Sequence, residues 1–316
     1  MQRIRDNGEA APIYNYNAFG NEKSSVETDP NPFRYCAEYW DKETESYYLR
    51  ARSYFPSTGR FTQEDPISDG LNWYAYCGNN PVMFTDRSGL APTALEAAYM
   101  ADHIYEDLTK DNYGEKLAEK FGGWTLINIM KSVLGGSLSN LKIGIYSRTI
   151  DGITEYAMVN KGTTPSSGND WINNITGPAG FSSDMRESIG YARVFDKRYE
   201  GQELTMIGHS KGGAEAIANA VATGRNAITF NPMSPNLKEY SLDGSSYTGT
   251  MIHYVVKGDI LNTTFGTPSV GATSYLKQQF KTPWVLKYSI FGGPINPIKN
   301  HYMSAVINAL KEEGSN

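Results

Sequence analysis

Short apolar runs alternate with segments of helical composition over most of the chain after residue 90. The apolar runs predict buried strands at 124–126, 141–147, 155–160, 204–207, 227–230 and 251–256. The segments around them predict helices at 92–105, 183–197, 214–221 and 301–311. Strands that alternate with helices form a mostly parallel sheet with helices on both faces, so the pattern predicts an α/β fold.

The first 90 residues have a different pattern, rich in Tyr, Arg, Gly and Pro and poor in helical spacing. Residues 47–54 alternate loosely, as a strand does, and the turn 56–60 follows. This pattern predicts a β-rich segment of short hairpins. Beyond it the composition changes, and Thr93 and Glu96 have the spacing of a capping box at a helix start. We therefore expect two domains, 1–90 and 91–316.

The chemically most informative stretch is Gly208-x-Ser210-x-Gly212, between the predicted strand 204–207 and the predicted helix 214–221. A serine on a sharp turn between a strand and a helix is the nucleophile-elbow pattern. Glycines on either side remove Cβ atoms that would clash with the strand and the helix. The turn raises the hydroxyl above the sheet, beside helix N–H groups that stabilise developing negative charge. The alternative is a Gly- and Ser-rich turn without chemistry.

A nucleophilic serine needs a base, and an acid that orients the base. In α/β-hydrolases the chain order is serine, acid, histidine. His103 precedes the serine, His209 lies inside the elbow and is interpreted as a packing residue, and His253 lies within a predicted strand. This leaves His301 as the predicted base, after a loop rich in Gly and Pro and at the start of the last predicted helix.

The acid and the oxyanion donors are predicted at strand ends. Asp259 directly follows the predicted strand 251–256, at the end where parallel sheets place catalytic groups, whereas Asp243 lies in a predicted surface turn. One oxyanion donor is expected to be the backbone N–H of Lys211, the residue after the nucleophile. The second is expected to be the N–H of Thr163, for which a plain β-turn is the alternative.

Composition and charge narrow the possible functions. The chain carries 29 Lys and Arg against 34 Asp and Glu, a formal net charge of −5, which argues against a nucleic-acid partner. No apolar run reaches about 18 residues, so no transmembrane helix is expected. The N-terminus lacks the pattern of a cleavable signal peptide. The two cysteines, Cys36 and Cys77, lie outside any metal-ligand pattern, so neither a metal nor another cofactor is expected.

Four stretches of the first domain follow one recognisable pattern: 31–35, 47–52, 59–67 and 72–82. They resemble the C-terminal core motif of Rhs/YD-repeat proteins, and residues 16–21 resemble a last YD repeat. In that family the repeats build a shell around a C-terminal toxin, and the core motif plugs the shell. The resemblance implies an upstream Rhs shell as a partner and makes residues 91–316 the variable effector.

Many members of that family cleave themselves after a D-P-x-G-L sequence by means of aspartates. Residues 86–90 read Asp-Arg-Ser-Gly-Leu, so Arg87 stands in place of the family's proline. The resemblance implies cleavage after Leu90, with Asp65 and Asp86 as candidate acids. The alternative is that both aspartates form turns.

The second domain carries a series of ordered landmarks: 161–163, 170–171, 208–213, 229–232, Asp259 and His301. Together they resemble the class 3 lipases, whose pattern runs R-G-T, D-W, G-H-S-L-G-G, T-F-G-x-P, D, H. Lys161, Lys211 and Asn231 stand where that family has Arg, Leu and Gly. The resemblance implies a lipase-like α/β-hydrolase domain with Ser210, Asp259 and His301 as its catalytic triad.

The two resemblances together imply a serine esterase or lipase, acting on phospholipid or acylglycerol esters, as the C-terminal effector of a Rhs-type toxin. Such a toxin needs a cognate immunity protein in the producing cell. The aromatic-rich stretch 265–300 is interpreted as a lipid-facing lid or acyl pocket, with transient membrane contact, or as ordinary core. We expect the protein to be cytoplasmic in the producer, and secreted or delivered to a target cell without a cleavable signal peptide.

Two other classes of function stay open. The elbow could serve as a scaffold in a non-catalytic Rhs-type surface or delivery module. The same fold could also support a peptidase or amidase.

Overall fold

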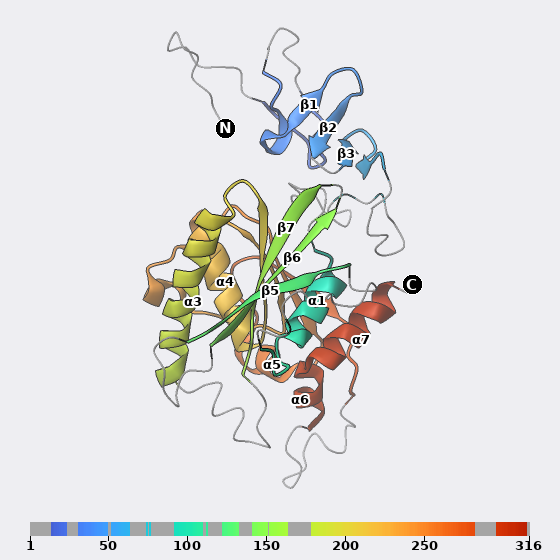
Figure 1. Cartoon of the computed structure of the whole chain (residues 1–316). Helices are drawn as coiled ribbons and strands as arrows, with labels where there is room; N and C mark the ends of the chain where they lie inside the picture. The colour runs from blue at the N-terminus through green and yellow to red at the C-terminus, as the bar shows by residue number, and fades with distance from the viewer. Residues whose placement is uncertain are drawn as a thin grey trace. The chain divides into compact units, whose positions relative to one another are not determined.

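The computed structural model describes residues 14–23, 31–49, 52–63, 74, 76, 92–109, 112, 122–132, 141–150, 152–163, 178–281 and 295–314. The chain divides into two compact units, Met1–Ala91 and Pro92–Asn316, each of which is described by itself (Figure 1). The candidate self-cleavage residues Asp65, Asp86 and Leu90 lie outside the described residues, as do Cys77 and the landmark at 170–171.

The first unit contains a four-stranded antiparallel sheet in the order β1-β2-β3-β4. Its elements are a 3-10 turn at Tyr35–Ala37 and the strands β1 (Tyr39–Asp41), β2 (Ser46–Leu49), β3 (Arg52–Phe55) and β4 (Arg60–Phe61). The β-rich prediction agrees with these strands.

The prediction of one strand over 47–54 was wrong, because Leu49 pairs with Arg52 and the chain reverses between them. In a single strand, Tyr47 and Tyr54 would point to opposite faces. In the hairpin they are cross-strand partners on one face, with ring centroids 6.4 Å apart. Both rings belong to the aromatic core of this unit, so burial of aromatic area favours the hairpin.

The second unit is built on a seven-stranded sheet in the order β11-β10-β9-β8-β7-β6-β5. Strands β7 to β11 are parallel to one another, and β5 and β6 are antiparallel additions at one edge, as expected of a mostly parallel sheet. The strands are β5 (Thr125–Lys131), β6 (Lys142–Ile150), β7 (Ile153–Asn160), β8 (Glu203–His209), β9 (Asn226–Phe230), β10 (Met251–Val256) and β11 (Ala272–Leu276).

Helices cover both faces of this sheet (Figure 1). They are α1 (Ala94–His103), α3 (Pro178–Arg198), α4 (Lys211–Thr223), α5 (Ile260–Phe265), α6 (Ile295–His301) and α7 (Met303–Gly314), with 3-10 turns at Leu237–Tyr240 and Gly244–Ser246. The sequence pattern predicted neither α5 nor β11. Among the helices that the structure describes, none combines the length and the apolar character needed to cross a bilayer.

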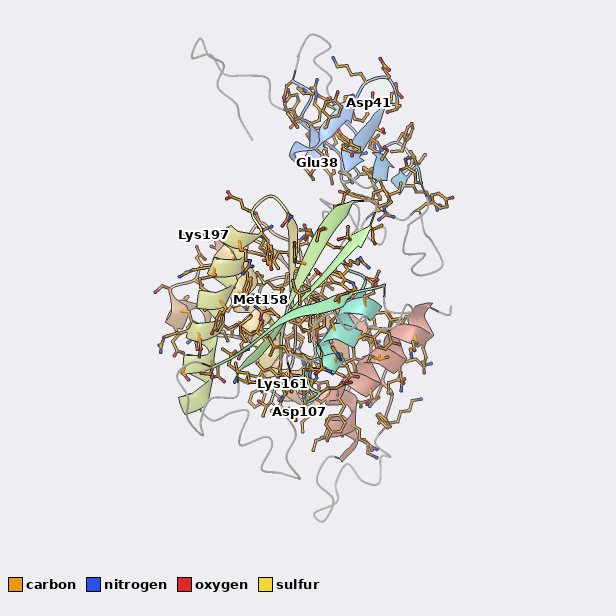
Figure 2. The ribbon with its side chains drawn as sticks, viewed as in Figure 1. Glu38, Asp41, Asp107, Met158, Lys161 and Lys197 are labelled. Atoms are coloured by element: carbon orange, nitrogen blue, oxygen red, sulfur yellow. The ribbon has the colours of Figure 1, made fainter. Side chains whose placement is uncertain are left out.

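Two hydrophobic cores lie on the two faces of the sheet, because successive side chains of a strand point to opposite sides. Met158 and Met206 pack on the side of α3 and α4, whereas Val159 and Ile207 pack on the side of α1 and α7. Figure 2 shows Met158 among the side chains packed around the sheet. The sheet is therefore buried on both faces, and its strand ends are left to carry the polar groups.

A buried ion cluster ties α1 to the sheet. Arg148 of β6 contacts both Glu155 of β7 and Glu96 of α1, at 2.5 Å from Glu96, and its guanidinium lies over the Trp124 ring. Glu96 also closes the predicted capping box with Thr93. Burial raises the pKa of Glu155 to about 8, although the Arg148 charge opposes the shift. The two buried carboxyl groups thus share one guanidinium as their ion-pair partner.

We expect Arg148→Met to lower the free energy of unfolding by about 3–5 kcal/mol, because it leaves buried carboxyl groups without their cation. The control is Lys277→Met, which removes an exposed ion pair to Glu312 and should change stability by less than about 1 kcal/mol. Urea unfolding measures both. Equal losses in the two variants would contradict the role given to the cluster.

Candidate active site

Ser210 lies at the turn between β8 and α4, with backbone angles φ 57° and ψ −124° that a non-glycine residue rarely adopts. Hydrogen bonds hold this strained residue in place. Its N–H donates to Phe230 O at 3.1 Å, and its carbonyl accepts from the N–H groups of Gly213 at 3.0 Å and Met233 at 3.1 Å. The Ser210 side chain is fully buried, and its Oγ has no hydrogen-bond partner within the described part of the chain.

The two elbow glycines are required by close approach of backbone atoms. A Cβ at Gly208 would lie 2.1 Å from the carbonyl oxygen of Gly212. A Cβ at Gly212 would lie 2.2 Å from the carbonyl oxygen of Asn160, at the end of β7. The steric reason expected from the sequence therefore holds, with the helix as the clashing element at 208 and a neighbouring strand end at 212.

Asp259 and His301 form a buried pair, with 2.5 Å between Asp259 Oδ2 and His301 Nδ1. Asp259 is also the N-cap of α5, and its Oδ1 accepts from the backbone N–H and the side-chain amide of Asn262, each at 2.8 Å. Burial alone would raise the pKa of Asp259, but the His301 charge and these hydrogen bonds outweigh it and lower that pKa. The ionised carboxylate therefore accepts a hydrogen bond from Nδ1–H of His301, and Nε2 of the neutral imidazole keeps its lone pair.

His301 lies at the end of α6, and α7 begins at Met303. The prediction that this histidine opens the last helix was therefore wrong. The predicted loop before it included Pro297, which instead lies in the first turn of α6. A proline is tolerated there, because the first N–H groups of a helix have no partner within the helix. The candidate base is thus the last residue of α6, next to the break between two helices.

His209, interpreted from the sequence as a packing residue, makes a hydrogen bond with each ring nitrogen. Nδ1 lies 2.7 Å from the Tyr105 hydroxyl, and Nε2 lies 2.7 Å from the carbonyl oxygen of His301. Because a carbonyl can only accept, Nε2 carries the proton and Nδ1 accepts from Tyr105. Burial, together with the charge of His301, lowers the pKa of His209 to about 3, so the ring is neutral.

The same contact places the candidate base beside the elbow. The rings of His209 and His301 have centroids 4.8 Å apart, and His209 directly precedes Ser210. Asp259 follows β10, and Ser210 follows β8, so both start from carboxyl ends of the parallel strands. The structure thus gathers the three candidate triad residues around one end of the sheet. Asp243, the rival acid, is exposed and caps a 3-10 turn.

The candidate oxyanion residues both belong to segments close to the candidate nucleophile Ser210. Lys211 is the first residue of α4. Thr163 is partly buried and follows Gly162, at which a Cβ would lie 3.1 Å from the Cβ of Ser210. The segment after β7 therefore passes close to the elbow. Figure 2 labels Lys161, at the start of this segment, and Asp107, whose charge acts on it.

Lys211 has a second set of contacts that the sequence did not reveal. Its side chain turns inward and pairs with Asp184 of α3, and its Nζ lies 3.6 Å from Glu215 of α4. Burial raises the pKa of Glu215 to about 7, although the Lys211 charge opposes the shift. The amide of Asn160 donates to Glu215 at 2.9 Å, so the network reaches β7. These contacts tie α3 and the sheet to the residue after the candidate nucleophile.

Within the described ranges, no group of three His, Cys, Asp or Glu side chains is arranged to hold a metal ion. Cys36 is partly exposed, with its backbone in the left-handed region.

A parallel sheet covered by helices, with a strained serine between a strand and a helix, defines the α/β-hydrolase fold. Residues 96–299 match the family described as phospholipase-like, with a Tle-like phospholipase domain. Because this match covers more than half of the 316 residues, the chain belongs to that family. The second unit is therefore of the lipase-like ester-hydrolase type.

Three curated relatives share shorter segments with the chain. The tRNA nuclease WapA of Bacillus subtilis is 43% identical over 91 residues, 26% of this chain and 4% of that protein. The toxin protein Tse5 of Pseudomonas aeruginosa is 38% identical over 73 residues, 22% of this chain and 6% of that protein. The extracellular phospholipase A1 of Serratia liquefaciens is 30% identical over 105 residues, 33% of this chain and 30% of that protein.

The chain thus spans only a small part of the length of these relatives. Among solved structures, lipase II from Rhizopus niveus is similar with a TM-score of 0.43 and 17% identity, over 58% of this chain and 78% of that one.

We expect the neutral, buried His209 to make folding sensitive to acid. Between its ordinary pKa of 6.5 and about 3, the unfolded chain binds a proton that the folded protein excludes, so stability falls as pH falls through this range. This one site contributes up to about 1.4 kcal/mol per pH unit. His209→Gln keeps a donor for the His301 carbonyl but does not titrate. Its free energy of unfolding in urea should therefore fall less steeply with acid than that of the wild type. An identical slope would contradict this account.

Proposed function

We propose that the second unit is a serine esterase that hydrolyses the carboxylic esters of phospholipids or acylglycerols. The observation that supports this most strongly is the buried Asp259–His301 pair, beside an elbow that holds Ser210 in a strained turn. A carboxylate, an imidazole and a hydroxyl in this chain order are the parts that ester hydrolysis through an acyl-enzyme requires.

In the proposed mechanism, Nε2 of His301 accepts the proton of Ser210 Oγ as the oxygen attacks the ester carbonyl carbon. The backbone N–H groups of Lys211 and Thr163 donate to the oxyanion of the tetrahedral intermediate. His301 then returns the proton to the leaving alkoxide, and the acyl group stays on Ser210. Water, deprotonated by His301, releases the fatty acid and restores the serine. Asp259 holds the imidazole in the required tautomer and stabilises its charged form.

We further propose that this esterase is the effector of a Rhs-type toxin. The first unit would be the Rhs/YD core, with the domain boundary at 90/91 and cleavage after Leu90. The family match to a Tle-like phospholipase and the relative named as a toxin support this proposal. In this setting the effector is delivered to a target cell, contacts its membrane lipid transiently and is neutralised in the producer by an immunity protein.

We expect Ser210→Ala to lower kcat on mixed phospholipid and acylglycerol vesicles by about 10³-fold or more, because it removes the nucleophile. Mass spectrometry of the released fatty acids and lysolipids gives both rate and head-group preference. Asp259→Asn should lose activity to a similar extent, whereas the matched change Asp243→Asn, in an exposed turn, should keep it. Labelling of Ser210 by a fluorophosphonate adds a test that needs no substrate. Equal activity of Ser210→Ala and wild type would refute the nucleophile assignment.

The toxin proposal has its own test. Expression of the full chain in a bacterium without the cognate immunity protein should arrest growth and release lysolipid or fatty acid, and Ser210→Ala should do neither. Normal growth with active enzyme in the lysate would count against the toxin role while leaving the esterase in place. Absence of labelling and of hydrolysis would favour the non-catalytic module, and activity on amides alone would favour the peptidase or amidase.

A further inference from the structure

The break between α6 and α7 leaves main-chain carbonyls that need hydrogen-bond donors. The last carbonyls of a helix have no partner within the helix, and burying them without donors is costly. Asn300 and His301, the final residues of α6, are at most 1% exposed. Because both residues are shielded from water, their carbonyl oxygens must accept hydrogen bonds from nearby groups of the protein.

The side chain of Asn231 supplies donors to both carbonyls. Its Nδ2 donates to the carbonyl oxygens of Asn300 at 3.0 Å and His301 at 3.1 Å. Its Oδ1 accepts the backbone N–H of Val256, the last residue of β10, at 2.9 Å. Asn231 is fully buried. One amide group therefore connects the end of β10, from which the candidate acid follows, to the end of α6, which carries the candidate base.

The backbone at Asn231 explains part of the residue choice but not all of it. Its φ is 40°, in the left-handed region that glycine adopts most easily and asparagine tolerates. The class 3 lipases have glycine at the matching place in their T-F-G-x-P pattern. A glycine would therefore make the turn but would leave the three side-chain hydrogen bonds unmade. The asparagine adds a link that the turn itself does not need.

We propose that Asn231 is a positioning residue for the triad. By fixing the main chain at Asn300 and His301 relative to the end of β10, its amide sets the distance between the imidazole and Asp259 and the direction in which Nε2 points. His209 supports the same carbonyl of His301 from the elbow side. This inference rests on the proposed esterase function and deepens it, because Asn231 touches no reacting atom and acts through His301.

The test compares two substitutions of Asn231 in the full chain. Asn231→Gly keeps the left-handed turn and removes all three side-chain bonds. Asn231→Asp keeps the acceptor for Val256 and turns a carboxylate oxygen toward the two carbonyls in place of the donor. Ser241→Gly is the matched control, because Ser241 is exposed, has a φ of 56° and lies in a turn of the same unit. Urea unfolding establishes that each variant is folded under the assay conditions.

We expect Asn231→Gly to lower kcat on a soluble p-nitrophenyl ester by about 10- to 100-fold with little change in KM, because small misplacements of catalytic groups act mainly on the chemical step. A looser Asp259–His301 pair stabilises the charged imidazole less, so the acid limb of kcat/KM should move to lower pH. The downfield proton resonance of His301 Nδ1 should broaden or shift in Asn231→Gly and stay unchanged in Ser241→Gly. Asn231→Asp should lose at least as much kcat as Asn231→Gly.

A folded Asn231→Gly or Asn231→Asp with wild-type kcat and an unchanged pH profile would overturn the proposal, and so would an equal loss of kcat in Ser241→Gly. These outcomes differ from failure of the esterase itself, which would show as equal rates for wild type and Ser210→Ala. The proton resonance of His301 Nδ1 reports on the position of the imidazole independently of the measured kcat values.

Discussion

The hydrogen bond between Asp259 and His301 is the constraint on which the rest of the second unit depends. It joins residues that lie 42 positions apart in sequence, and both side chains are buried. A carboxylate in such a place must be surrounded by donors. Asn262 and His301 provide them, and the lowered pKa of Asp259 records the result. The parallel strands, the start of α5 and the end of α6 must all be in place for this pair to form.

Other buried polar side chains around this pair also connect separate helices and strands. Asn231 links β10 to α6, and His209 links the elbow to α6 and, through Tyr105, to the chain after α1. Lys211 links α4 to α3, and these two helices lie on the same face of the sheet. Each of these side chains pairs with a buried donor or acceptor that would otherwise be unsatisfied. Polar contacts therefore hold the site in place together with hydrophobic packing.

Local pattern was enough to predict six of the seven strands in the sheet of the second unit, the helices that flank the elbow, and the serine with its two glycines. Chain order was enough to single out Asp259 and His301 as candidates. The polar connections could not be predicted, because the partners of His209 and Asn231 lie 25 to 104 residues away in sequence and only tertiary structure brings them together. The hairpin between Leu49 and Arg52 was missed for a related reason, since aromatic burial across strands decided it. The one usable hint was Asn231, which stood in place of a glycine.

The position of His301 in α6 has a consequence for protein synthesis. A ribosome makes the chain from its N-terminus, so the sheet up to β11 and the elbow leave the exit tunnel before the helix that carries the imidazole. In the proposed mechanism His301 takes the proton of Ser210, and this imidazole is in place only after residues 295–301 dock against Asn231 and Asp259. The proposed esterase would therefore be inactive in the nascent chain and would become active only once the late helices have packed.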